Sequence, residues 1–223
     1  MRGIAFVGGE GPGPEVLKKL SLGADLLVAA DSGLIALEDA GLKPHWIVGD
    51  MDSLGALSSG APDGLGRLDK YAPEQVLRYP ADKDFTDTEL AINLLHEKGC
   101  DEIWIVGGGG GRTDHLFAIR SLFEREKPPR RWFTANEDIS CLDAGLCRRG
   151  SLPAGSLLSV FPLGGGPWEA ESSGLKWPLK GLGWDRGKFG LSNVALDGDF
   201  EIVSLKGRFM IIMPVFPEGF ESE

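Results

Sequence analysis

Pro80-Ala-Asp-Lys-Asp-Phe-Thr-Asp-Thr-Glu-Leu90 opens the stretch that decides the fold, and Gly107-Gly-Gly-Gly-Gly-Arg-Thr-Asp-His115 closes it. Thr86 and Glu89 have the spacing of a capping box, and leucines then recur at helical intervals until Gly99. We therefore expect a helix that begins at about Thr86. The apolar run 102–106 is short and rich in β-branched and aromatic residues, which predicts a buried strand that ends at the glycines.

The rest of the first 137 residues also alternates short apolar runs with helical segments. We expect strands at 4–7, 26–30, 45–48, 75–79, 102–106 and 131–135, and helices at 14–20 and 33–40. This alternation predicts a Rossmann-like, mostly parallel sheet with helices on both faces. Ligands of such sheets bind outside the carboxyl ends of the strands. Aspartates that follow the predicted strands could converge there: Asp31, Asp50, Asp52, Asp84, Asp87 and Asp114.

After about Glu137 the pattern changes to short apolar runs separated by Gly, Pro, Asp and Ser clusters, without a helical period. Runs at 156–161, 200–205 and 209–213 predict strands of an antiparallel β domain. We expect two domains, an α/β domain at 1–137 and a β domain at 138–223.

Composition excludes several classes of partner. The formal net charge of −10 argues against nucleic acid, which requires a basic face. No apolar run reaches the length that a bilayer needs, and the first residues predict a strand instead of a signal peptide. Three cysteines without a common zinc spacing predict buried, reduced thiols and hence a cytoplasmic protein.

The chemistry-bearing motifs each have a structural and a functional interpretation. Asp50 and Asp52 share one loop and could hold Mg²⁺ together with substrate phosphates, or could be ordinary turn residues. Asp84 and Asp87 flank a helix start, where the helix dipole stabilises carboxylates in any case. Lys83, beside them, could contact a phosphate.

The glycine run could be a flexible loop, but its amides could also approach a polyanion, although it lacks the Walker pattern. Arg112 supplies a planar fork that suits phosphate oxygens, and Asp114 is a further metal-ligand or base candidate. His115 could contact a phosphate, or it could be a residue of the first helical turn that makes a local hydrogen bond.

Six segments, in order along nearly the whole chain, resemble the thiamine pyrophosphokinase family. They are Ala30-Asp-Ser-Gly33, Gly49-Asp-Met-Asp-Ser53, Asp82-Lys-Asp-Phe-Thr-Asp87 with Glu89-Leu-Ala91, Gly110-Gly-Arg-Thr-Asp-His115, Gly174-Leu-Lys-Trp-Pro-Leu179 and Leu191-Ser-Asn193. The resemblance implies an α/β domain followed by a β-sandwich, a homodimer, and Mg²⁺-dependent transfer of a diphosphoryl group from ATP to thiamine.

The resemblance also implies roles for individual residues. The catalytic and metal-binding set would be Asp50, Asp52, Asp87 and Asp114; the ATP-binding set would be Asp31, Lys83, Thr86, Gly110, Gly111, Arg112 and His115. Ser192 and Asn193 would bind thiamine across the dimer. This chain departs from the family at Val194, where many members have Glu, and in the last strand, where some members have an aromatic residue that stacks on the pyrimidine.

Two alternatives remain open at this stage. A diphosphokinase for another hydroxymethyl heterocycle, such as a pterin, would keep the phosphate-binding end and change the contacts of the β domain. A non-enzymatic sensor of thiamine or nucleotide would bind its ligand without releasing AMP.

Overall fold

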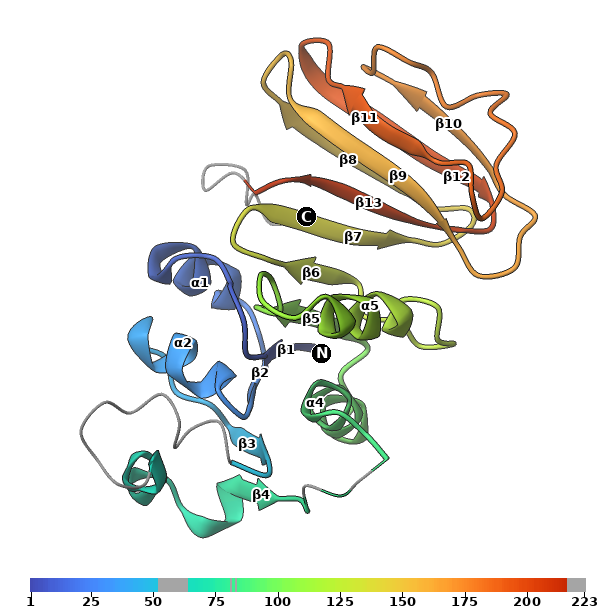
Figure 1. Cartoon of the computed structure of the whole chain (residues 1–223). Helices are drawn as coiled ribbons and strands as arrows, with labels where there is room; N and C mark the ends of the chain where they lie inside the picture. The colour runs from blue at the N-terminus through green and yellow to red at the C-terminus, as the bar shows by residue number, and fades with distance from the viewer. Residues whose placement is uncertain (52–63, 81, 83, 216–223) are drawn as a thin grey trace. The chain divides into compact units, whose positions relative to one another are not determined.

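The computed structural model describes residues 1–51, 64–80, 82 and 84–215 (Figure 1). The chain divides into two compact units. The first comprises Met1–Ile119 with Phe133–Ala135, and the second comprises Arg120–Trp132 with Asn136–Glu223. The expected domains at 1–137 and 138–223 stay a prediction about which segments fold independently.

Five parallel strands form the sheet of the first unit. Their spatial order is β5 (Glu102–Val106), β1 (Arg2–Phe6), β2 (Leu26–Ala30), β3 (Trp46–Gly49) and β4 (Val76–Arg78). The central strands are apolar on both faces because helices cover both of them. Ile4, Val28 and Ile47 accordingly have no exposed surface.

Helices connect these strands, as the sequence predicts. They are α1 (Pro14–Ser21), α2 (Gly33–Asp39), α4 (Asp87–Glu97) and α5 (Thr113–Leu122), together with the short 3₁₀ segments η1 (Gly64–Lys70) and η2 (Pro73–Gln75). Figure 1 shows α1 and α2 beside one face of the strands and α4 beside the other. The Rossmann-like fold class expected for this half of the chain is confirmed.

The second unit contains two antiparallel sheets. One has the order β11 (Gly190–Val194), β9 (Leu157–Leu163), β13 (Arg208–Pro214) and β7 (Glu137–Leu142). The other has the order β10 (Glu169–Ser173), β12 (Gly198–Lys206) and β8 (Cys147–Leu152). The remaining strand, β6 (Arg131–Phe133), lies at the division between the two units.

One apolar core lies between the two sheets of the second unit. It includes Val160 and Ile211 from the first sheet and Phe200 and Ile202 from the second, all buried. The expected antiparallel β-sandwich is therefore present. Three of its strands were predicted; β7, β8, β10 and β11 were not.

The expectation that all three thiols are buried is wrong for one of them. Cys100 and Cys141 are buried and not bonded to another cysteine, whereas Cys147 is exposed. Cys147 begins β8, whose outward positions alternate with its inward ones, and sequence alone does not fix that register. Within the described part of the chain, no helix is both long enough and apolar enough to cross a membrane.

Candidate active site

Three aspartates converge at the carboxyl ends of the parallel strands. Asp31 directly follows β2, Asp50 directly follows the adjacent β3, and Asp87 is the first residue of α4. Each offers one carboxylate oxygen to a group in which all three oxygens lie within 4.8 Å of one another. All three residues are partly buried. The prediction that aspartates after strands meet at this edge is thus realised by these three.

Gly49, the last residue of β3, makes room for this cluster. Its φ is 139°, which side chains rarely adopt, and a Cβ there would lie 3.2 Å from Asp87 Oδ1 and 3.3 Å from the Cβ of Asp31. Two non-glycine residues near Gly49 also have a strained backbone, because their φ values are positive: 47° for Asp31 and 68° for Met51. Non-glycine residues held in the left-handed region concentrate at functional sites, since other parts of the structure must stabilise them.

The strained backbone of Asp31 is anchored on both sides. Its amide donates to Val48 O at 2.9 Å, and its carbonyl accepts from the amide of Leu34 at 3.1 Å. Gly33, which begins α2, lies so close to β1 that a Cβ would stand 2.1 Å from Phe6 O. The segment Asp31-Ser-Gly33 therefore turns tightly at the strand end, and this turn directs Asp31 toward the cluster.

A capping box fixes the position of Asp87. The amide of Thr86 donates to Glu89 Oε2 at 2.9 Å, and the amide of Glu89 donates back to Thr86 Oγ1 at 3.2 Å. The helix expected to begin at about Thr86 is thus confirmed, with Thr86 as its N-cap. Asp87 lies in the first turn of α4, where the helix dipole favours a carboxylate.

The donor set fits a divalent cation. Three carboxylates in one space repel each other unless a cation neutralises them, and carboxylate oxygens are the ligands that hard cations prefer. The cluster of Asp31, Asp50 and Asp87 can therefore hold a metal ion. Asp84 is exposed and is not part of this cluster. Asp52 and Lys83, which the sequence also indicated, lie outside the described residues.

The glycine run is ordered by a segment that the sequence analysis passed over. Gly108 N donates to Gly8 O at 2.8 Å, and Glu10 and Gly109 exchange backbone hydrogen bonds of 2.7 and 2.9 Å. The sequence does contain a sign of this segment. A second glycine-rich turn, 8–13, follows β1, the strand that pairs with β5. These bonds argue against a purely flexible loop.

Two glycines of the run keep the backbone accessible. Gly110 and Gly111 both have φ 63°, and a Cβ at Gly111 would meet no described atom within 4 Å. Both residues are exposed. A phosphate can therefore approach the backbone of Gly111 closely, as its predicted role in ATP binding requires, whereas the carboxyl group of Glu10 lies beside Gly110.

Asp114 binds Arg112 and is not part of the three-carboxylate cluster. Arg112 donates from Nε to Asp114 Oδ1 at 3.1 Å and from Nη2 to Oδ2 at 2.6 Å, and both side chains are exposed. These hydrogen bonds lower the pKa of Asp114 and raise that of Arg112. The amide of the exposed His115 also donates to Asp114 Oδ1, at 3.0 Å. The assigned roles of all three residues remain predictions.

The two residues predicted to bind thiamine differ in their surroundings. Ser192 is exposed, has φ 54°, and donates its amide to Ser159 Oγ at 3.1 Å. Asn193 is buried, with 3% of its surface exposed, and its side-chain amide is bonded to the backbone of Trp177. Neither arrangement tests the predicted role.

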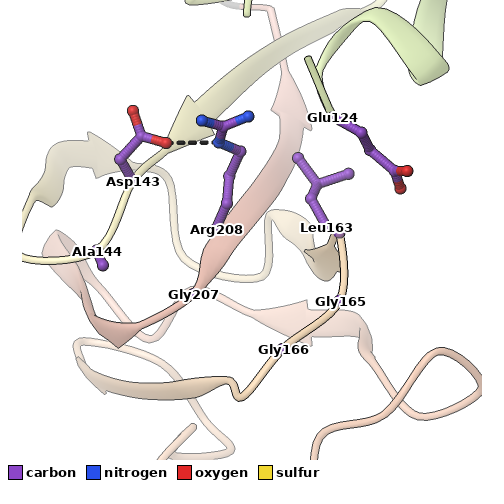
Figure 2. Close-up of a pocket in the computed structure, with 9 residues that line it drawn as sticks. Glu124, Asp143, Ala144, Leu163, Gly165, Gly166, Gly207 and Arg208 are labelled. Carbon is purple, nitrogen blue, oxygen red and sulfur yellow. Dashed lines mark hydrogen bonds and ion pairs between the residues drawn. The ribbon is translucent and has the colours of Figure 1, made fainter. Parts of the chain in front are cut away.

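A pocket of about 430 Å³ in the second unit is lined by the loop Gly164–Gly166 and by charged side chains (Figure 2). Those side chains already have partners: Asp143 accepts from Arg208 Nε at 2.5 Å and from Arg130 Nη1 at 2.6 Å, and Glu124 accepts from Arg120. Arg208 Nη1 also donates to the carbonyls of Phe123 and Arg125. We interpret this network as structural.

Fold and site together define a class: an α/β protein with a metal-competent carboxylate cluster at the ends of its parallel strands, followed by a β-sandwich. The thiamin pyrophosphokinase catalytic domain matches residues 17–131, more than half of the chain. The chain belongs to the thiamin pyrophosphokinase family, as the six motifs indicated.

Individual relatives agree with this assignment. Thiamine pyrophosphokinase of Bacillus subtilis is 39% identical over 103 residues, an alignment that spans 46% of this chain and 45% of that protein. The crystal structure of the Bacillus subtilis thiamine pyrophosphokinase superposes with a TM-score of 0.75 at 24% identity, over 96% of this chain and 99% of that one. That of the Geobacillus thermodenitrificans thiamin pyrophosphokinase gives 0.70 at 26% identity, over 98% and 99%.

Proposed function

We propose that this chain is a thiamine pyrophosphokinase, which transfers a diphosphoryl group from ATP to the hydroxyl of thiamine and yields thiamine diphosphate and AMP. Family membership supports the reaction class. The observation that carries the proposal is the convergence of Asp31, Asp50 and Asp87. A site that moves phosphoryl groups needs such carboxylates to hold a cation on the polyphosphate.

Mg²⁺ is the cation that we propose, since it is commonly bound by one or two carboxylates together with substrate phosphates. When bound, it would neutralise charge that builds up on the phosphate oxygens. Asp31, Asp50 and Asp87 would hold it, with Asp52 as a further ligand from the same loop. This assignment adds Asp31, first proposed as an ATP contact, to the metal-binding set.

The remaining residues would act by binding and orientation. Arg112 would present a planar fork to phosphate oxygens, and the backbone amides of the exposed residues Gly110 and Gly111 would approach the same group. Lys83, Thr86 and His115 would lie along the phosphates. Attack of the thiamine hydroxyl on the β-phosphorus then displaces AMP, and most of the catalysis comes from holding the two substrates in line.

We also propose a cytoplasmic homodimer in which Ser192 and Asn193 lie on the thiamine side of the site. The free thiols of Cys100 and Cys141 are consistent with a reducing compartment. Size-exclusion chromatography coupled to light scattering tests the dimer, since a monomer at enzyme-assay concentrations would contradict it.

The last strand gives a reason to test an acceptor other than thiamine. The last strand, β13, carries one aromatic residue, Phe209, which is fully buried in the core and is not exposed to a ligand. Val194 and the buried Phe209 both depart from the family pattern, and both departures concern contacts with the acceptor and not contacts with the phosphates. A diphosphokinase for a pterin-like hydroxymethyl heterocycle would retain the same metal and phosphate residues.

The test is release of AMP from ATP and Mg²⁺ with and without thiamine, with the second product identified by mass. Thiamine-dependent AMP together with thiamine diphosphate is expected. AMP release that needs a pterin instead would establish the second acceptor, and thiamine binding without AMP release would indicate a sensor.

A further inference from the structure

A carboxylate lies directly against the glycine run of the first unit. The carboxyl group of Glu10 occupies the space beside Gly110, where a Cβ would stand 2.6 Å from Glu10 Cδ and 2.8 Å from Glu10 Oε1. Gly110 has φ 63°, so its backbone conformation and this contact both favour glycine. The side chain of Glu10 is exposed. The place of this acid is therefore built into the glycine run.

Short contacts with the same run fix the backbone of Glu10. Glu10 N donates to Gly109 O at 2.7 Å, and Gly109 N donates to Glu10 O at 2.9 Å. Glycine allows the two segments to touch, because a Cβ at Gly9 would stand 2.8 Å from Gly109 O. A side chain on so constrained a backbone reaches a small region of space. Glu10 can thus present its oxygens beside Gly110 with little further loss of backbone entropy when a ligand binds.

The turn that carries Glu10 also lies beside the carboxylate cluster. It follows β1, which pairs with β2, and Asp31 directly follows β2. Gly8, in the same turn, lies so close to Ser32 that a Cβ would stand 2.3 Å from Ser32 Oγ. Neighbouring strands lie about 4.8 Å apart, so the ends of β1 and β2 are within the length of one nucleotide. A nucleotide whose phosphates share a cation with Asp31 can therefore reach the turn after β1.

The chemistry of a carboxylate restricts which part of ATP can lie against Glu10. An ionised carboxylate accepts hydrogen bonds and repels phosphate oxygens, so its natural partner is a donor. ATP has such donors in two places, the two ribose hydroxyls and the amino group of adenine, and the hydroxyls are nearer to the phosphates. Two adjacent hydroxyls also match the two oxygens of a carboxylate. Acidic side chains bind ribose hydroxyls in this way in dinucleotide-binding parallel sheets.

We propose that Glu10 binds the ribose hydroxyls of ATP, and that residue 110 is glycine in order to admit this carboxylate. The inference rests on the proposed function, which makes ATP the diphosphoryl donor. The phosphates then approach the backbone of Gly111 and the guanidinium of Arg112, while the sugar lies on the side of Glu10. The site thereby prefers ribonucleotides, because a nucleotide without these hydroxyls leaves the desolvated carboxylate without a partner.

The experiment measures dissociation constants by calorimetry for ATP and for 2′,3′-dideoxy-ATP, with Mg²⁺ present and thiamine absent. The wild type should bind ATP about tenfold more tightly, since hydrogen bonds to a charged group are strong. Glu10→Ala should weaken ATP about tenfold and change dideoxy-ATP by less than about twofold. Glu10→Gln keeps an acceptor without the charge and should give an intermediate loss. Glu15→Ala, at an exposed carboxylate of α1, is the control and should change neither constant.

Four other outcomes would each overturn the proposal. Tighter binding of both nucleotides by Glu10→Ala would show that the carboxylate only repels the phosphates. Weaker binding of both, with a greater need for Mg²⁺, would show that it holds a cation. Equal weakening of both, with inosine triphosphate unaffected, would assign it to the amino group of adenine. No change in either constant would place Glu10 outside the nucleotide site.

Failure of the inference can be told apart from failure of the proposed function. Release of AMP by the wild type with thiamine present reports on the reaction, whereas the dissociation constants are measured without an acceptor. A wild type that releases AMP but binds ATP and dideoxy-ATP equally well overturns the inference alone, and one that binds neither nucleotide overturns both. Glu10→Gln, which keeps the size of the side chain, replaces Glu10→Ala if thermal melts show that the alanine variant is unfolded.

Discussion

Gly49 lies against Asp87, so closely that a methyl group on Gly49 would stand 3.2 Å from the Oδ1 atom of Asp87. These residues come from different elements, the end of β3 and the start of α4. A side chain at Gly49 would crowd the carboxylate of Asp87 and the Cβ of Asp31. The absence of a side chain at Gly49 therefore leaves room for both residues.

Gly49→Ala should reduce turnover by at least about tenfold, because the added methyl group displaces Asp87 and strains a φ of 139°; it should also cost about 1–3 kcal/mol of stability. AMP release and thermal unfolding measure the two effects. Gly23→Ala is the matched control, since Gly23 has φ 77° and open space around its Cβ position. It should lose stability and keep turnover. Equal loss of turnover in both variants would refute a steric role for Gly49 at the site.

Asp31→Asn and Asp87→Asn should each reduce turnover by about a hundredfold or more, because each removes a charged ligand from the cluster. Mg²⁺ should stabilise the wild type and have less effect on the variants. Thermal melts with Mg²⁺ or EDTA check this, and the exposed Asp84→Asn is the control. If Mg²⁺ raised the melting temperature equally in the wild type and in all three variants, the metal site would be contradicted.

Sequence patterns predicted well the strands and the helix that position this site, because residues close together in the sequence determine where these elements begin and end. The Thr86–Glu89 spacing located the start of α4, and the rule for parallel sheets brought aspartates after adjacent strands to one edge. The patterns could not select among those aspartates. Asp84 and Asp87 are three residues apart, yet the first is exposed and the second joins the cluster. That difference depends on where the capped helix begins its first turn.

The β unit was less predictable because its determinants are distant in sequence. Strand β8 contains two arginines and a glycine, and β10 contains two glutamates, so neither has a clear apolar alternation. Both become strands because β12 lies between them and pairs with each. The hydrogen bonds between Asn193 and Trp177 were not predicted for the same reason, since the two residues are sixteen positions apart.

Asp114→Asn should abolish turnover, as predicted for a catalytic or metal-binding carboxylate, without unfolding the protein. The structure gives a second possible reason for the loss of turnover. Two hydrogen bonds join the guanidinium of Arg112 to the carboxylate of Asp114, so Asp114 could act by orienting Arg112. If that is its role, Arg112→Ala should raise the dissociation constant of ATP, measured without turnover, and adding Asp114→Asn should raise it no further. Arg112→Lys should not restore the wild-type dissociation constant, because an ammonium lacks the fork. A larger loss in the double variant would favour direct action by Asp114.

The hydrogen bond from Arg112 lowers the pKa of Asp114, so Asp114 is ionised at every pH above its ordinary range. Its contribution to activity should therefore be constant between about pH 6 and 9. Dissociation constants of ATP for the wild type and Asp114→Asn across that range test this point. A change in ATP affinity near neutral pH that the wild type shows and Asp114→Asn lacks would require a pKa above the ordinary value and would contradict the pairing.

The carboxylate of Asp143 should stabilise the folded protein less in acid than at neutral pH. Burial raises the pKa of Asp143, but hydrogen bonds from Arg208 (Figure 2) and Arg130 lower it by more, and the net pKa lies below that of an unfolded chain. The folded protein therefore binds fewer protons here than the unfolded one, and stability increases with pH through this range. The contribution is complete above about pH 5 and is lost as the pH falls below about 4.

Asp143→Asn should thus lower the melting temperature at pH 7, because two arginines lose their charged partner, and this difference from the wild type should shrink as the pH falls below about 4. Thermal melts from pH 3 to 8 measure it. Glu171→Gln, which breaks the exposed pair with Lys180, is the control and should change the melting temperature little at any pH, because solvent screens that pair. A difference that stays constant across the whole pH range would mean that the variant disturbs packing, and that the charge of Asp143 does not stabilise the second unit.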